Sequence, residues 1–393
     1  SAAMAVIAPI WNIIYSFGLL CGIGGSVIYA VARGERDDVK AANGYFTSAF
    51  ILGALWALIL WVLVWVCEEP LLRLFGANDA LMPLCKEYMI APKLTVPVYV
   101  FINLLSSFLR NDGDPGRATK AVIFGGIFNV FGDYFFVFTL DMGIKGAGIA
   151  TAMGASMSVL VMLTHFIGKK NTLKFVKPLR ILNSFKMISV NGFSSFIVDV
   201  AMGIATMLFN RRVMEYLGTD ALAVYGVIVV VGTLVQCCSY GIGQAAQPVI
   251  SRNFGAGLTD RIKTMLKYNI ITAAVFGAIW TVLSMAMPQV FIKLFMTPSP
   301  EVLSIAPGII RIYAISFVLL PFNIYSTYYF QAIMRAKISL IASVARGIVI
   351  SGALILLLPV AFGGNAVWWA MPITEAVVFV YSAVMMKKVK LSR

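Results

Sequence analysis

The chain has 393 residues, of which 60% are hydrophobic and 12% are charged, and its mean hydropathy is +0.89. Soluble domains carry about 25% charged residues, so the composition excludes an ordinary soluble protein and indicates one that crosses a membrane repeatedly. The net charge of +14 does not indicate nucleic-acid binding, because its cations lie in short loops beside apolar runs. Cations in such loops set topology and contact anionic lipids, so no nucleic-acid partner is expected.

Eleven apolar runs are each long enough to cross a hydrocarbon core of about 30 Å as a helix. They lie at residues 5–30, 44–67, 85–109, 117–140, 144–167, 185–210, 221–247, 266–287, 309–334, 338–360 and 366–386. The sequence therefore predicts an all-α polytopic membrane protein.

The second half of the chain repeats the first. The triplet GIG at residues 22–24 recurs at 241–243, and Arg110 recurs as Arg335, with the offset staying between 219 and 225 residues. A period held over many landmarks indicates an internal duplication. In the second half a span precedes the one that carries GIGQ, so we expect a further helix before GIGG, of roughly 40 to 50 residues with its flanks. The expected architecture is two six-helix lobes related by a pseudo-twofold axis along the membrane normal.

The distribution of lysine and arginine predicts the orientation. Most of the 31 fall in one set of alternate loops, which the positive-inside rule places in the cytoplasm together with the C-terminus. The longest basic loop joins the two halves. We therefore expect an N-terminal lobe at 1–168, a cytoplasmic linker at 169–184 and a C-terminal lobe at 185–393, in the plasma membrane.

Cysteine and histidine indicate no metal site. Cys67 and Cys85, at the outer ends of neighbouring helices, are expected to be packed thiols, although a disulfide is conceivable there. The single histidine, His165, is expected as an interfacial residue near a cytoplasmic helix end.

Ionisable residues at membrane depth are the most informative, since each costs about 2.5–3.5 kcal/mol unless it is paired or hydrated. They are Lys93, Asp133, Asp199, Arg346 and Glu375. Glu375 and Arg346 lie at nearly the same level on successive helices, so Glu375 is either a functional acid or half of a structural ion pair. The same alternatives hold for Asp133, with Lys93 as its partner.

Asp199 differs because no base lies at its level on an adjacent helix. It must be protonated, or it must face water and a cation. An acid in this position can exchange a proton or a sodium ion for a cationic substrate. The structural alternative is a protonated carboxyl group that is hydrogen-bonded to a neighbouring helix.

Four amide side chains are candidates to complete a site: Asn129, Asn191, Gln244 and Gln247. Asn129 lies four residues before Asp133 on one helix face, and Asn191 lies two turns before Asp199. Each of the four also has a structural interpretation as a hydrogen bond between helices.

The stretch GIGQAAQPVISRNFGAG at 241–257 resembles the hallmark segment of the multidrug and toxic compound extrusion (MATE) family. RNDGDP at 110–115, NVFGD at 129–133 and GIKGAGIATA at 143–152 resemble its first-half counterparts, and FQAIMRA at 330–336 and the segment 372–375 also fit. The resemblance covers the whole chain. It implies a twelve-helix, two-lobe antiporter that exports cationic amphipathic compounds in exchange for protons or sodium by rocking between outward and inward states.

The sequence departs from the family pattern in two places. The helix expected to be missing is the one that often carries a coupling aspartate in the family. The tenth family helix, Ile309–Met334 here, has no acid where sodium-coupled members have one, and Asp199 matches only loosely the acidic position of the seventh helix. The coupling ion is therefore left open between H+ and Na+, and no resident cofactor is expected.

Two other functions remain open. Related superfamily members flip lipid-linked saccharides, and basic inner loops would suit anionic head groups. A membrane enzyme acting on lipids is the alternative from another class, but no nucleophile–base pair, metal cluster or phosphate-binding glycine loop is present, so an enzyme is not expected. The expected partners are a cationic small-molecule substrate and membrane lipids, with a monomeric protein.

Overall fold

The computed structural model describes residues 2–36, 39–178 and 180–391, and every regular element in these ranges is helical. The chain divides into two compact units, Ser1–Val200 and Ala201–Arg393. The division falls within α8 (Ile181–Gly255), which is interrupted at Gly218, where φ is +81°. By this division the basic segment 169–184 belongs to the first unit, and the lobe boundaries expected from the sequence stay a prediction.

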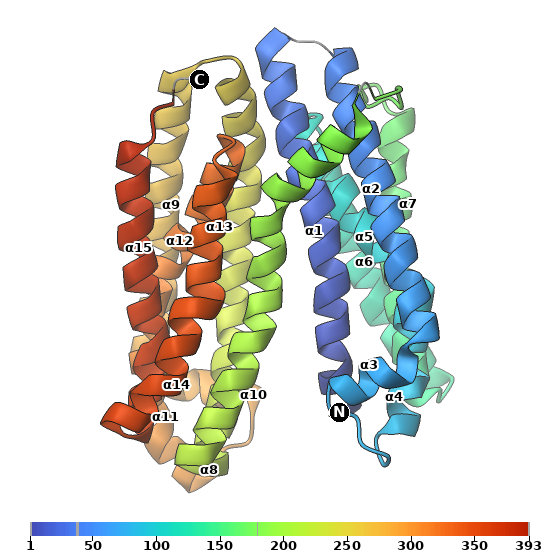
Figure 1. Cartoon of the computed structure of the whole chain (residues 1–393). Helices are drawn as coiled ribbons and strands as arrows, with labels where there is room; N and C mark the ends of the chain where they lie inside the picture. Colours follow the sequence, from blue (N-terminus) through green and yellow to red (C-terminus); the bar gives the residue numbers. More distant parts are fainter. Residues whose placement is uncertain (1, 37–38, 179, 392–393) are drawn as a thin grey trace. The chain divides into compact units, whose positions relative to one another are not determined.

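The first unit consists of long helices with short ones at one end. In chain order it contains α1 (Ala2–Arg36), α2 (Val39–Val66), α3 (Glu68–Leu74), α4 (Met82–Tyr88), α5 (Ile90–Asn111), α6 (Pro115–Asp133), the π-helical turn η1 (Tyr134–Thr139), α7 (Gly143–Leu163), the 3₁₀ turn η2 (Thr164–Ile167) and the start of α8. The short helices α3 and α4 lie at the end of this unit opposite the last turn of α1 and the first turn of α2 (Figure 1).

The second unit contains the remainder of α8 and the elements that follow it. They are α9 (Thr259–Ala286), α10 (Pro288–Phe295), α11 (Pro300–Ala314), α12 (Ser316–Ala332), α13 (Ala336–Val344), the π-helical turn η3 (Ala345–Val349), α14 (Ile350–Phe362), the 3₁₀ turn η4 (Gly364–Trp369) and α15 (Ala370–Lys388).

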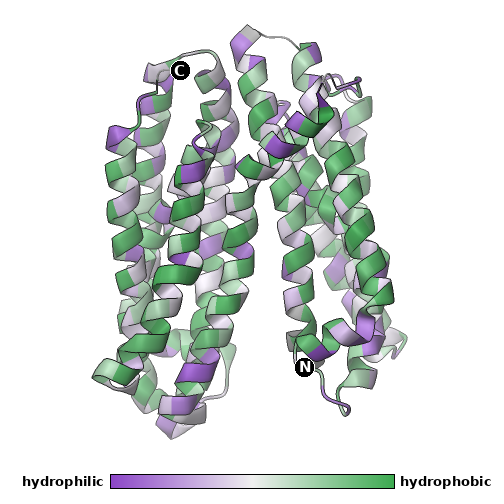
Figure 2. Cartoon of the chain, viewed as in Figure 1, coloured by the Kyte–Doolittle hydropathy of each residue, from purple (hydrophilic) through white to green (hydrophobic). Residues whose placement is uncertain are grey.

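Ten helical stretches of the described residues are long and apolar enough to cross a membrane. One of them is the 75-residue α8, which holds two of the expected spans, one on each side of Gly218. All eleven apolar runs therefore fall on such helices. Hydrophobic residues cover most of the length of these helices, and many hydrophilic residues lie near their ends (Figure 2). Helices suit this environment because they satisfy every backbone hydrogen bond internally.

Glycines of the GIG motif and of its repeat allow close helix contacts in both units. In the first unit, a Cβ placed on Gly22 of α1 would lie 2.7 Å from the carbonyl oxygen of Asn103 on α5. In the second unit, a Cβ on Gly243 of α8 would collide with the ring of Tyr328 on α12. Gly22 corresponds in the repeat to Gly241, where nothing lies within 4 Å of a Cβ, so the close contact falls on different glycines of the motif in the two units.

The sequence predicted His165 as an interfacial residue near a helix end, and the structure shows that its side chain is enclosed by protein. Its ring is 0% exposed, with Nε2 2.8 Å from Oδ2 of Asp112 and Nδ1 3.2 Å from Oδ2 of Asp114. Burial would raise the pKa of the Asp114 carboxyl group, but its bond to His165 and the charge of Arg117 outweigh burial and lower it. The RNDGDP motif thus supplies both carboxylates of a buried cluster that sequence spacing did not indicate.

Gly192 of α8 offers a direct test of close packing in the first unit, because a Cβ there would collide with the backbone of Leu20 on α1. We expect Gly192→Ala to lower the stability of the folded protein by about 1–3 kcal/mol through overpacking. This loss is measured as a lower midpoint of thermal unfolding in detergent, with the remaining folded protein quantified by size-exclusion chromatography. Gly126→Ala is the matched control, since nothing lies within 4 Å of a Cβ there. Equal midpoints for the two variants would contradict the packing argument.

Candidate functional site

Polar side chains from α6 and α7 meet in the first unit. Asn129 and Asp133 lie one turn apart near the end of α6, which packs along α7. Nδ2 of Asn129 donates to Oγ1 of Thr151 at 3.5 Å, and the Thr151 hydroxyl donates to the carbonyl of Ala147 at 2.9 Å. Asn129 therefore makes the interhelical contact that the sequence left as its structural alternative, and it does so one turn from an acid.

Asp133 lies at the edge of this polar group and is partly buried. Tyr88 of α4 faces Thr151 and Trp11, and Asp133 is close enough to influence the tyrosine electrostatically. Asp133 is the last residue of α6 and directly precedes the π-helical turn η1. Such turns are frequent at functional sites. We call Tyr88, Asn129, Asp133 and Thr151 the first-unit cluster.

The structural alternative for Asp133, a pair with Lys93, is wrong. Nζ of Lys93 lies 2.8 Å from Oε2 of Glu68 and 4.9 Å from the ring centroid of Trp65. Glu68 is the ion-pair partner of Lys93 because the two residues lie at the same end of the unit. Glu68 is the first residue of the short helix α3, and Lys93 lies in the first turn of α5. Among the described residues, Asp133 makes no ion pair within 4 Å.

Asp199 and Asn191 lie on the first part of α8, as expected. Asn191 is 2% exposed, and Asp199 is partly buried. Two buried serines, Ser194 and Ser195, lie between them in the sequence. Several buried positions in this part of α8 therefore carry polar side chains. Asp199 stays a candidate for cation exchange.

Glu375 of α15 is paired in the second unit. Its Oε1 accepts a 2.8 Å bond from Nε of Arg346, and its Oε2 accepts a 2.6 Å bond from Nδ2 of Asn323 on α12. The Glu375 side chain is 0% exposed, and that of Arg346 is 13% exposed. The ion pair that the sequence allowed is thus present, and both carboxylate oxygens already have donors in this state.

The two glutamines of the repeat motif lie on α8 in the second unit. Nε2 of Gln244 donates to the hydroxyl of Tyr328 at 3.4 Å. Gln247 is 3% exposed, and its Nε2 has no hydrogen-bond partner in the part of the chain that the structure describes. Gln244 therefore bridges two helices, whereas Gln247 has donor capacity to spare.

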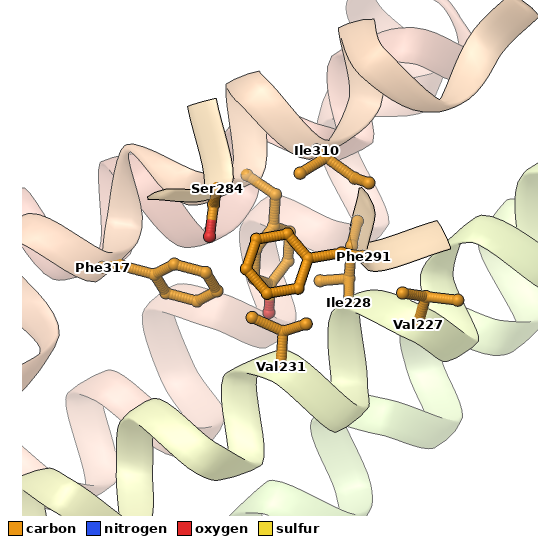
Figure 3. Close-up of a pocket in the computed structure, with 8 residues that line it drawn as sticks. Val227, Ile228, Val231, Ser284, Phe291, Ile310 and Phe317 are labelled. Atoms are coloured by element: carbon orange, nitrogen blue, oxygen red, sulfur yellow. The ribbon is translucent and has the colours of Figure 1, made fainter. Parts of the chain in front are cut away.

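A small apolar pocket lies elsewhere in the second unit. Figure 3 shows the Ser284 hydroxyl pointing into it, with aromatic and aliphatic side chains on its other sides. The lining residues are Val227, Ile228, Val231, Ser284, Phe291, Ile310, Tyr313 and Phe317. None of them is charged at neutral pH.

Three contributors to these clusters were missed from the sequence. Tyr88 and Thr151 join the first-unit cluster, and Asn323 joins the Glu375 pair. The signals were weak: Thr151 is the second-last residue of the GIKGAGIATA stretch, and Asn323 is an isolated amide within a span. Neither observation shows which helix faces these residues.

The Arg346–Glu375 pair gives a test of its structural role. We expect Arg346→Met and Glu375→Met each to destabilise the protein by about 3–5 kcal/mol, because each leaves a buried charge without its partner. The double variant should lose less than the sum of the two. The exposed pair of Lys263 with Asp260 is the matched control, and its replacement by methionine should change the unfolding midpoint little. Additive losses at Arg346 and Glu375 would show that the two residues act separately.

Similar proteins place the chain among membrane transporters. The family model MatE matches residues 2–135 and 193–356. Multidrug export protein MepA of Staphylococcus haemolyticus (strain JCSC1435) is 24% identical over 383 residues, covering 96% of this chain and 82% of that protein. MepA of Staphylococcus aureus (strain MSSA476) is 22% identical over 383 residues, covering 95% and 82%.

Solved structures share the fold. An outward-facing multidrug resistance MATE family transporter of the MOP superfamily superimposes with a TM-score of 0.90 at 22% identity, covering 98% of this chain and 88% of that one. A MOP superfamily transporter from Pyrococcus furiosus, described as having a binding pocket of reverse polarity that suggests a different function, gives a TM-score of 0.88 at 22% identity, covering 99% and 89%. With the family model matching most of its length, the chain belongs to the MatE family.

Proposed function

We propose that the protein exports cationic amphipathic compounds across the plasma membrane in exchange for protons or sodium ions. The observation that carries the proposal is the first-unit cluster: an acid at membrane depth whose neighbours are an amide and two hydroxyls rather than a cation. Ionisable residues inside a membrane are costly and are functional by default. An acid of this kind binds one monovalent cation at a time, which is what an exchanger needs.

The relatives support the same class of activity. The staphylococcal proteins are named multidrug export proteins, and MATE transporters share the fold. Members of the family are transporters and not enzymes, so the lipid-modifying enzyme considered from the sequence is not proposed.

The exchange follows from charge balance at one carboxylate. When Asp133 holds a proton or a sodium ion, its negative charge is neutralised and a cationic substrate has no counter-ion there. When the ion leaves, the carboxylate attracts the substrate's positive group, with Asn129 and Thr151 providing polar contacts. A ligand shifts a conformational equilibrium only through its different affinity for the two states. Competition for one acid therefore couples the two fluxes, provided that each cation favours a different state.

Asp199 is the second candidate for this role, with Asn191 as its neighbour on α8. Gln244, Gln247 and Glu375 are proposed as substrate contacts in the second unit, where Glu375 would have to release Arg346 to bind a cation. We further propose a monomer whose C-terminus is cytoplasmic, as the distribution of lysine and arginine indicates.

Ethidium efflux from energised membrane vesicles tests the proposal. We expect Asp133→Asn to abolish efflux driven by a proton or sodium gradient, because the amide cannot bind the coupling ion. Asp199→Asn, measured in parallel, identifies which acid is required. Asp260→Asn is the matched control, since its side chain is 96% exposed.

Full efflux in both Asp133→Asn and Asp199→Asn would contradict coupling at either acid. Absence of ethidium efflux from the wild-type protein, together with transfer of a lipid-linked saccharide, would favour the flippase alternative instead.

A further inference from the structure

Residues 169–178, a turn followed by a segment without regular structure, lie between η2 and α8 in the chain. We call these residues the strap. Its backbone is held by side chains of α2: Nδ2 of Asn43 donates to the carbonyl of Thr172 at 3.0 Å, and Oδ1 of Asn43 accepts from the amide of Lys174 at 3.1 Å. The amide of Val176 donates to Oγ1 of Thr47 at 3.0 Å. The strap therefore follows one face of α2 in a fixed conformation.

A second set of bonds fixes the start of the strap. Asp112 accepts from both the amide and the hydroxyl of Thr172, the former at 2.9 Å. The same carboxylate contacts Nε2 of His165 at 2.8 Å and accepts from the hydroxyl of Tyr29 at 3.1 Å. We call the buried cluster around His165 the clasp; it holds the carboxylates of Asp112 and Asp114 against the ring of His165.

The contacts with α2 place the strap at the level of lipid headgroups. Asn43 and Thr47 lie four and eight residues after Val39, or about 6 and 12 Å along the helix. The 28 residues of α2 span about 42 Å, which exceeds the hydrocarbon core of about 30 Å and leaves its first turns in the headgroup region. Phe175 of the strap packs at this depth, with its ring centroid 5.1 Å from that of Phe46 and 5.0 Å from that of Phe50.

The strap carries exposed cations and an exposed aromatic ring. Lys169, Lys174 and Lys177 are exposed, and Phe175 is 59% exposed. No aspartate or glutamate occurs between Asp141 and Asp199 in the sequence. An aromatic ring at the acyl boundary flanked by lysines matches the chemistry of an anionic membrane surface.

We propose that the strap is a preformed binding site for anionic phospholipid headgroups of the cytoplasmic leaflet. Lys169, Lys174 and Lys177 bind the phosphate groups, and Phe175 enters the bilayer between them. The site depends on the cytoplasmic orientation of this loop and is independent of the transported compound. Because the clasp holds the backbone in place, lipid binding requires little ordering of the loop. This lowers the entropic cost of binding and favours lipids bound at a fixed site over non-specific electrostatic attraction.

Native mass spectrometry of the purified protein, equilibrated with equal amounts of phosphatidylglycerol and phosphatidylcholine, tests the site. We expect the triple variant Lys169→Gln, Lys174→Gln and Lys177→Gln to retain at least about threefold less phosphatidylglycerol than wild type, with phosphatidylcholine unchanged. The matched control neutralises three exposed lysines of the C-terminal tail, Lys387, Lys388 and Lys390, by the same change. It should retain phosphatidylglycerol as wild type does.

A second variant, Phe175→Ser, keeps every charge and removes the aromatic ring. We expect it to retain less phosphatidylglycerol than wild type, because the ring provides the apolar part of the contact. Wild-type retention in the strap lysine variant, or an equal loss in the tail variant, would overturn the proposal. The second of these results would mean that total charge rather than the strap determines lipid retention.

Discussion

The dominant constraint on this chain is the cost of a polar group surrounded by hydrocarbon. The backbone meets it by forming helices, which satisfy their own hydrogen bonds, and the side chains meet it by pairing. Lys93 pairs with Glu68 in the first unit, and Arg346 pairs with Glu375 in the second, where Asn323 satisfies the remaining carboxylate oxygen. Against this background, an acid without an ion pair among the described residues, as at Asp133, is costly to maintain, and for this reason we propose it as the place of an exchangeable cation.

The same constraint explains how helices pack within each unit. Helices in a lipid environment gain little from hydrophobic burial against one another, so small residues that allow close approach become important. Gly22 meets Asn103 in one unit, and Gly243 meets Tyr328 in the other. The loops follow a different rule, because they lie where water and headgroups can solvate charge. The clasp of His165 and the lysines of the strap both belong to that region.

Much of the fold could be predicted from the sequence, because apolar length alone locates spanning helices. The Arg346–Glu375 pair was also predictable, since both residues lie at one level on helices that follow each other in the chain. The sequence offered Asp133 as the partner of Lys93, whereas the partner in the structure is Glu68. Glu68 was missed because it lies on the short helix α3, which is too short to be recognised as an apolar run. Tyr88, Thr151 and the environment of His165 depend on which helices approach one another, and periodicity within one helix does not contain that information.

The account depends most on competition between the coupling ion and the substrate at Asp133. The direct measurement is the affinity of the purified protein for ethidium, determined across a range of pH and with or without sodium. The account predicts that protons or sodium ions weaken ethidium binding to the wild-type protein, and that Asp133→Asn removes this competition while the protein stays folded. Competition of wild-type strength in Asp133→Asn would contradict the account.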